Sequence, residues 1–115
     1  MNEPSRLHRR SAVRSAPDHL SDEAAAWWAE VLEAFELEPH HYAILERACE
    51  AMDRLRQAQA AIAADGITVE GRFGPKAHPA ISIERDNRTA FLRAVRELGL
   101  DLPGPDSRPP SRWQQ

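Results

Sequence analysis

The sequence predicts an all-α fold: a long helical hairpin plus a third helix, with a short extended or β-hairpin excursion between the second and third helices. Two observations predict this. Apolar residues recur at three- and four-residue steps in three segments bounded by glycine or proline, and one short stretch alternates apolar and polar residues. The chain has 115 residues, and about 80 of them have a composition suited to a packed core, so we expect one small domain.

The first helix is expected from Ser21 to about Glu36. Serine is a good N-cap, and the two acids that follow it lie where the helix dipole favours negative charge. The apolar stripe of this helix is wide and comprises Trp27, Trp28, Val31, Leu32 and Phe35. Because Trp27 and Trp28 are consecutive, we expect one to face the hairpin and the other to lie at its edge. Two roles are possible for these tryptophans: burial in a broad core within the chain, or contact with another subunit.

The second helix is expected from Pro39 or His40 to Asp65, where Gly66 ends it. With roughly 26 residues it would be about 39 Å long. Its apolar positions are Tyr42, Leu45, Cys49, Met52, Leu55, Ala58, Ala61 and Ile62. The alanine-rich end of this row permits a close approach of another helix.

The excursion is expected at residues 67–73, which alternate apolar and polar side chains between glycines. The third helix then begins at Pro79, a first-turn position, and ends at Leu98. With Gly99 at the helix end, Leu100 can fold back on Val95 as in a Schellman motif. The expected buried face is Ile81, Phe91, Leu92, Val95 and Leu98.

Both ends of the chain differ from the middle in composition. We expect a basic flexible arm at 1–19, a helical oligomerisation domain at 20–100, and a Pro-rich basic tail at 101–115. The net charge of −3 is uneven, because residues 20–70 carry eleven acids against three arginines, whereas residues 71–97 carry six bases against three acids. The acidic middle is thus flanked by basic segments.

Residues with catalytic potential do not form a recognisable constellation. The single cysteine, Cys49, lies in the apolar stripe of the second helix, where a small buried residue is the expected role. The adjacent His40 and His41 diverge on a helix, so the histidines are expected to be caps and surface residues rather than metal ligands. The glycines near 71–76 lack the spacing of a phosphate-binding loop. We therefore expect no enzyme activity, no cofactor, no metal site and no membrane insertion.

Basic residues indicate DNA contact through phosphates, without base readout. The residues expected to bind DNA are Arg6, Arg9, Arg10, Arg14, Arg72, Lys76, Arg85 and Arg88. Alternatively, these arginines only balance the negative charge of residues 20–70 within an oligomer. The residues expected at an oligomer interface are Trp27, Trp28, Val31, Phe35 and Met52. Trp113, isolated beside Arg112, is either an anchor for a partner's pocket or an accident of composition.

Several short motifs occur in an ordered series from Leu20 to Arg112. They are Leu20-Ser21-x-Glu23 leading to Trp28, Leu45-x-x-x-Cys49-x-x-x-Asp53-x-x-x-x-Ala58, Gly66-Ile67-Thr68, Gly74-x-Lys76-x-His78-Pro79, and Leu98-Gly99-Leu100 followed by Pro103, Arg108 and Arg112. In this order the chain resembles the short helical family of tailed-phage terminase small subunits. The motif residues read largely as structural, with His78 as a helix cap. After Leu100 the chain departs from the family pattern through the insertion Asp101-Leu102-Pro103-Gly104-Pro105.

The resemblance implies a non-enzymatic DNA-packaging component that forms a ring-like homo-oligomer. It would engage double-stranded viral DNA and regulate the large terminase subunit, which holds the ATPase and the nuclease. The residues implied in contact with that subunit are Arg108, Arg112 and Trp113. Further partners implied are the portal and an HNH nuclease, and the expected location is the cytoplasm of the bacterial host. The alternative is a helical protein–protein adaptor that does not bind DNA.

Overall fold

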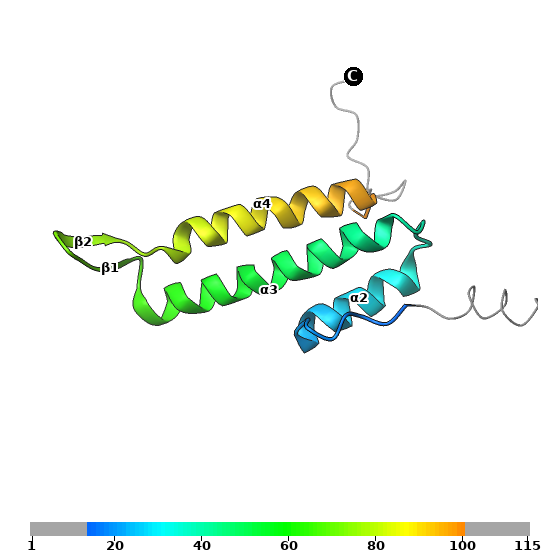
Figure 1. Cartoon of the computed structure of the whole chain (residues 1–115), viewed down its shortest axis with the longest axis horizontal. Coiled ribbons are helices and arrows are strands. Elements are labelled where there is room, and N and C mark those ends of the chain that lie inside the picture. Colours follow the sequence, from blue (N-terminus) through cyan, green and yellow to red (C-terminus); the bar gives the residue numbers. More distant parts are fainter. Residues whose placement is uncertain (1–13, 101–115) are drawn as a thin grey trace, which may run out of the picture.

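The computed structural model describes residues 14–100, which form three helices and a two-stranded antiparallel β-hairpin. The elements are α2 (Asp22–Ala34), α3 (His41–Asp65), β1 (Thr68–Gly71), β2 (Gly74–Ala77) and α4 (Ala80–Leu98). The helix α3 lies in the middle, with α2 along one side and α4 along the other, and the β-hairpin projects beyond one end of α3 and α4 (Figure 1). The predicted fold is confirmed, and the longest packed pair is α3 with α4.

Helix ends follow from local sequence. The Ser21 hydroxyl accepts a hydrogen bond from the Ala24 N–H at 3.1 Å, and Asp53 of α3 in turn accepts from the Ser21 N–H at 2.9 Å. At the end of α4, Gly99 adopts φ 77°, and the Leu100 N–H donates to the Val95 carbonyl at 3.1 Å. The predicted N-cap and the predicted Schellman motif are therefore confirmed.

His78 joins the end of α3 to the start of α4. Its Nδ1 accepts from the Ala80 N–H at 2.9 Å, which leaves the proton on Nε2 to be donated to Asp65 at 2.9 Å. The backbone N–H of His78 donates to the Ile67 carbonyl at 2.8 Å. The expected cap at His78 is present, and it also closes the base of the β-hairpin.

The core lies between α2 and α3 and is closed at one end by α4. Leu45 and Cys49 are fully buried, and the other buried members of the cluster are Leu20, Ala24, Trp28, Val31 and Leu98. The Trp28 side chain is only 3% exposed, whereas Trp27 is half-buried at the edge, with its ring centroid 5.3 Å from that of Phe91. The two tryptophans divide between interior and edge, as the sequence predicted.

Two details of the predicted helices are wrong. α2 ends at Ala34 rather than near Glu36, because Phe35 has already left the helix and adopts an extended conformation. Leu92 is 50% exposed, and the small residues Ala80 and Ala94 are buried on α4 instead. One residue turns a helix by about 100°, so the packing of the partly buried Phe91 against Trp27 directs Leu92 towards solvent.

Residues 14–19, which the sequence assigned to the arm, pack against the helices. The Trp28 indole N–H donates to the Arg14 carbonyl at 2.9 Å, and the Arg14 guanidinium lies 4.3 Å from the centre of the Tyr42 ring. His19 lies 2.7 Å from Glu50 of α3. The predictions made for residues 1–13 and 101–115 lie outside the described residues. Among the helices of the described range, none is long and apolar enough to cross a membrane.

Candidate nucleic-acid interface

Four arginines of α4 lie on its solvent-facing side. Arg85, Arg88, Arg93 and Arg96 are all exposed, whereas Ala80, Ala94 and Leu98 are buried on the other side. At about 100° per residue, the four arginines fall within an arc of roughly 140°. From the first to the last they span about 16 Å along the helix axis. Packing of the small residues against α3 is therefore what turns these cations outward.

The β-hairpin adds two cations next to the start of α4. Arg72 lies in the two-residue turn, and Lys76 pairs with Val69 across the ladder. A Cβ atom built on Gly71 would lie 3.0 Å from the Lys76 Cδ, so the lysine stem crosses this glycine near the turn. We call these six cations the basic set: Arg72, Lys76, Arg85, Arg88, Arg93 and Arg96.

Two members of the basic set are held by neighbouring acids. Arg88 contacts Glu84, one turn earlier, at 2.6 Å, and this hydrogen bond lowers the pKa of Glu84 from its ordinary value. Arg85 lies 3.5 Å from Asp86. Arg93 and Arg96 make no ion pair with the other residues of the 14–100 range. On α4, these last two arginines are the cations most readily available to an anion.

The predicted DNA-binding residues fall into separate groups. The continuous segment formed by the hairpin and α4 carries Arg72, Lys76, Arg85 and Arg88. Arg14 instead lies against Trp28 of α2 and Tyr42 of α3. Arg6, Arg9 and Arg10 lie outside the described residues. Sequence reasoning missed Arg93 and Arg96, although their spacing from Arg85 and Arg88 was the signal that could have found them.

The side of the molecule formed by α2 is acidic. Residues 20–38 contain no arginine or lysine, and their acids are Asp22, Glu23, Glu30, Glu33, Glu36 and Glu38. All six are exposed. Since α2 and α4 flank α3 on opposite sides (Figure 1), the charge of the molecule is polarised along the direction that runs from α2 to α4. A polyanion is expected to approach the α4 side.

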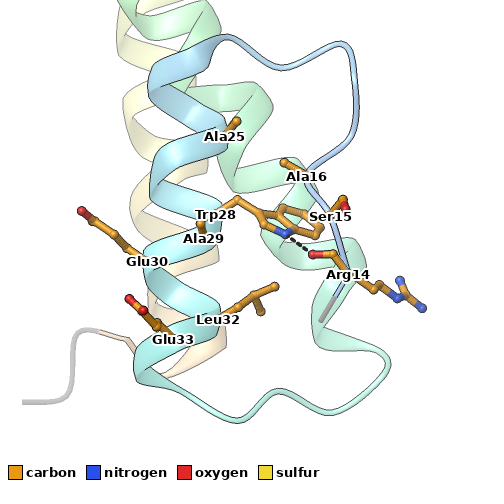
Figure 2. Close-up of a pocket in the computed structure, with 9 residues that line it drawn as sticks. All are labelled: Arg14, Ser15, Ala16, Ala25, Trp28, Ala29, Glu30, Leu32 and Glu33. Carbon is orange, nitrogen blue, oxygen red and sulfur yellow. Dashed lines mark hydrogen bonds between the residues drawn. The ribbon is translucent and has the colours of Figure 1, made fainter. Parts of the chain in front are cut away.

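A groove of about 300 Å³ lies between residues 14–16 and α2. Figure 2 shows the Trp28 indole pointing from α2 towards this segment, with its N–H directed at the Arg14 carbonyl. Small apolar side chains and Leu32 line much of the rest, and Glu30 and Glu33 extend from the helix at its border. Because the groove borders the acidic side and holds no paired nucleophile and base, it resembles a packing defect rather than a reaction site.

The predicted oligomer-interface residues are not equally available. Trp28 and Val31 are buried within the chain itself, so their assignment to an interface is corrected: neither offers appreciable surface to a second copy. Trp27 and Met52 are partly buried, and Phe35 is 43% exposed. These three remain as apolar surface. Arg108, Arg112 and Trp113, expected to contact the large subunit, lie outside the described residues.

Among the described residues, one group of side chains has the spacing of a metal site. His19, Glu46 and Glu50 bring one ligand atom each to within 4.8 Å of one another. His19 and Glu50 already contact each other at 2.7 Å, and all three side chains are open to solvent to a third or more. The contact between His19 and Glu50 attaches residue 19 to α3, and this structural role accounts for the position of these side chains without a metal.

Cys49 is held as a thiol. Its Sγ donates to the Ala24 carbonyl at 3.6 Å in the core, and burial, followed by the nearby carboxylates Asp53, Glu50 and Glu46, raises its pKa to about 12. A thiol with this pKa is not a nucleophile at neutral pH.

We expect native Cys49 to react with a disulfide reagent at pH 8 at least a hundredfold more slowly than the urea-unfolded chain. The thiolate fraction falls by about three powers of ten when the thiol pKa rises from 9.0 to about 12, and burial restricts access further. Absorbance of the released thiol reagent measures both rates. Equal rates in the two states would contradict the buried position.

A family model described as phage terminase, small subunit, matches residues 24–108, which include α2 except its first two residues, and all of α3, the β-hairpin and α4. No curated protein and no solved structure matches the chain.

Proposed function

Because this chain belongs to the phage terminase small-subunit family, whose role is in genome packaging, we propose that it contacts double-stranded viral DNA through the basic set. The proposal rests on one observation above all: four arginines of α4 face solvent on the side opposite to the packed face. It assigns the chain a non-catalytic role, in which the ATPase and nuclease activities belong to the large subunit.

The geometry of α4 suits the backbone of a duplex. One strand carries a phosphate per 3.4 Å of axis, so the roughly 16 Å between Arg85 and Arg96 spans about five phosphates. Arginine offers a planar donor fork that matches a phosphate, and none of these contacts reads a base. The acidic side formed by α2 would repel the duplex, which orients the molecule with α4 towards DNA.

Assembly into a ring-like homo-oligomer is the second part of the proposal. The core that the chain buries is small and includes several alanines, and domains of this size commonly complete their stability through copies of themselves. Trp27, Phe35 and Met52 supply apolar surface for such contacts. Contact with the large subunit is proposed for the segment with Arg108, Arg112 and Trp113, and regulation of that subunit would act through it.

We expect the full chain to bind duplex DNA with an affinity that falls steeply with salt. If each of the six cations neutralises one phosphate, a plot of log affinity against log salt has a slope of about −5.4. Fluorescence anisotropy of a labelled duplex between 50 and 300 mM NaCl measures this slope. Multi-angle light scattering of the chain at the same NaCl concentrations should give one discrete oligomer.

A chain that leaves duplex DNA unshifted at the lowest salt would instead favour a protein–protein adaptor. A monomer in light scattering would remove the ring from the proposal and leave DNA contact as a separate question. The two measurements therefore test the two parts independently.

A further inference from the structure

The tip of the β-hairpin presents an aromatic ring to solvent. Phe73 is 95% exposed and lies with Arg72 in the turn between β1 and β2. The hairpin extends past the ends of α3 and α4, so the ring is remote from the core (Figure 1). A fully exposed phenylalanine gains nothing from folding, and its position at the end of a projection suggests a contact with a partner.

The hairpin is fixed at its base rather than loosely attached. A two-stranded ribbon has little stability of its own, but His78 bonds to Ile67, Asp65 and Ala80, which lie on the three segments that meet there. The antiparallel register continues up to the pair Gly71 and Gly74, next to the turn. The tip is thereby presented at a defined position.

The surroundings of the ring are cationic. The Arg72 guanidinium lies 5.4 Å from the centre of the Phe73 ring, and the Lys76 stem crosses Gly71 towards the same turn. Side chains alternate between the two faces of a ribbon, and Glu70 pairs with Pro75, one step from the pair of Val69 and Lys76. The one acid of the hairpin thus lies on the face opposite to Lys76.

We propose that the hairpin enters a groove of duplex DNA and that Phe73 inserts between base pairs as a wedge. Arg72 and Lys76 would contact the phosphates on either side. A two-stranded ribbon is narrow enough to enter a DNA groove, and apolar wedges are used by DNA-bending proteins to unstack a base step. A protein pocket would have to desolvate the two cations beside the ring, which disfavours that partner. The inference rests on the proposed DNA contact and adds distortion of the duplex to it.

The test uses the full chain and a duplex with 2-aminopurine at a central position and a fluorophore pair at its ends. The unsubstituted chain should raise the 2-aminopurine fluorescence and shorten the end-to-end distance. Phe73→Ala should lower affinity by about tenfold, as expected for the loss of one stacking contact, and abolish both signals. The salt slope should stay unchanged, since no charge is lost.

Two matched variants complete the design. Phe73→Trp should retain the fluorescence and distance signals, and Ile67→Ala, which truncates another exposed apolar side chain at the base of the hairpin, should leave both signals and the affinity as they are. Circular dichroism of each variant verifies that the helices are intact.

Any one of four results would overturn the inference. If the unsubstituted chain binds DNA without unstacking, or if Phe73→Ala retains the signals, the wedge is wrong while the proposed DNA contact stands. If Phe73→Ala changes the oligomer size and leaves DNA binding unaltered, the Phe73 side chain contacts another copy of the chain instead of DNA. If the unsubstituted chain binds no DNA, the proposed function fails together with the wedge.

Discussion

Replacing Trp28 with alanine is expected to lower the free energy of unfolding by about 3–5 kcal/mol, the range found when a large buried aromatic side chain is removed. Trp28 is 3% exposed and belongs to the buried cluster between α2 and α3. Its loss also frees the Arg14 carbonyl from the indole N–H and removes the surface on which residues 14–16 lie. Urea unfolding followed by circular dichroism, at one fixed chain concentration, measures the change.

Two neighbouring variants separate the causes. Trp28→Phe retains an aromatic ring but lacks the N–H donor, so it should cost less than the alanine variant, with the lost hydrogen bond contributing about 1 kcal/mol. Trp27→Ala, one residue away but half-buried, should cost clearly less than Trp28→Ala. If Trp27→Ala were the more destabilising of the two, the assignment of interior and edge would be reversed.

Removing the four arginines of α4 together is expected to weaken DNA binding by about three and a half powers of ten at 0.1 M salt. Each neutralised phosphate contributes a slope of about 0.9 to the salt dependence, so four lost contacts cost nearly one power of ten each at this salt and flatten the slope by about 3.6. The substitutions are Arg85→Ala, Arg88→Ala, Arg93→Ala and Arg96→Ala. All four side chains are exposed, so stability should change little. Anisotropy titrations at several salt concentrations give both quantities.

A matched pair of double variants tests position against charge. Arg85→Ala with Arg96→Ala removes two charges from the basic set, and Arg47→Ala with Arg54→Ala removes two exposed charges from α3. The first pair should flatten the salt slope by about 1.8 and the second should leave it nearly unaltered. Equal effects from the two pairs would mean that net charge alone attracts DNA and that the α4 surface has no special role.

The features that the sequence predicted well are local ones. The cap at Ser21 and the stops at Gly66 and Gly99 each depend on a few consecutive residues, and the structure confirms them. The start predicted at Pro79 is one residue early, because Pro79 is the N-cap and α4 begins at Ala80. Helix capping needs no tertiary information, because the unpaired groups at a helix end and the side chains that satisfy them are neighbours in the chain.

The features that the sequence did not predict depend on contacts between distant segments. Leu92 and Phe91 are equally apolar, and only the position of Trp27 decides which of the two is covered. Likewise, nothing local to residues 14–19 indicates that Trp28 and Glu50 hold them against the helices. For the basic set, counting charges identified the basic segment 71–97. Which side of α4 faces solvent, and therefore that Arg93 and Arg96 point outward, depends on how α4 packs on α3.

The bonds of His78 also have a mechanical consequence. They link the end of α3, the first residue before the ribbon and the first turn of α4 in one place. Because the three hydrogen bonds of His78 connect the ribbon to both helices, a force applied at the tip of the ribbon would tilt α3 and α4 together. The ribbon, which extends past the ends of α3 and α4 (Figure 1), would then move together with this helix pair.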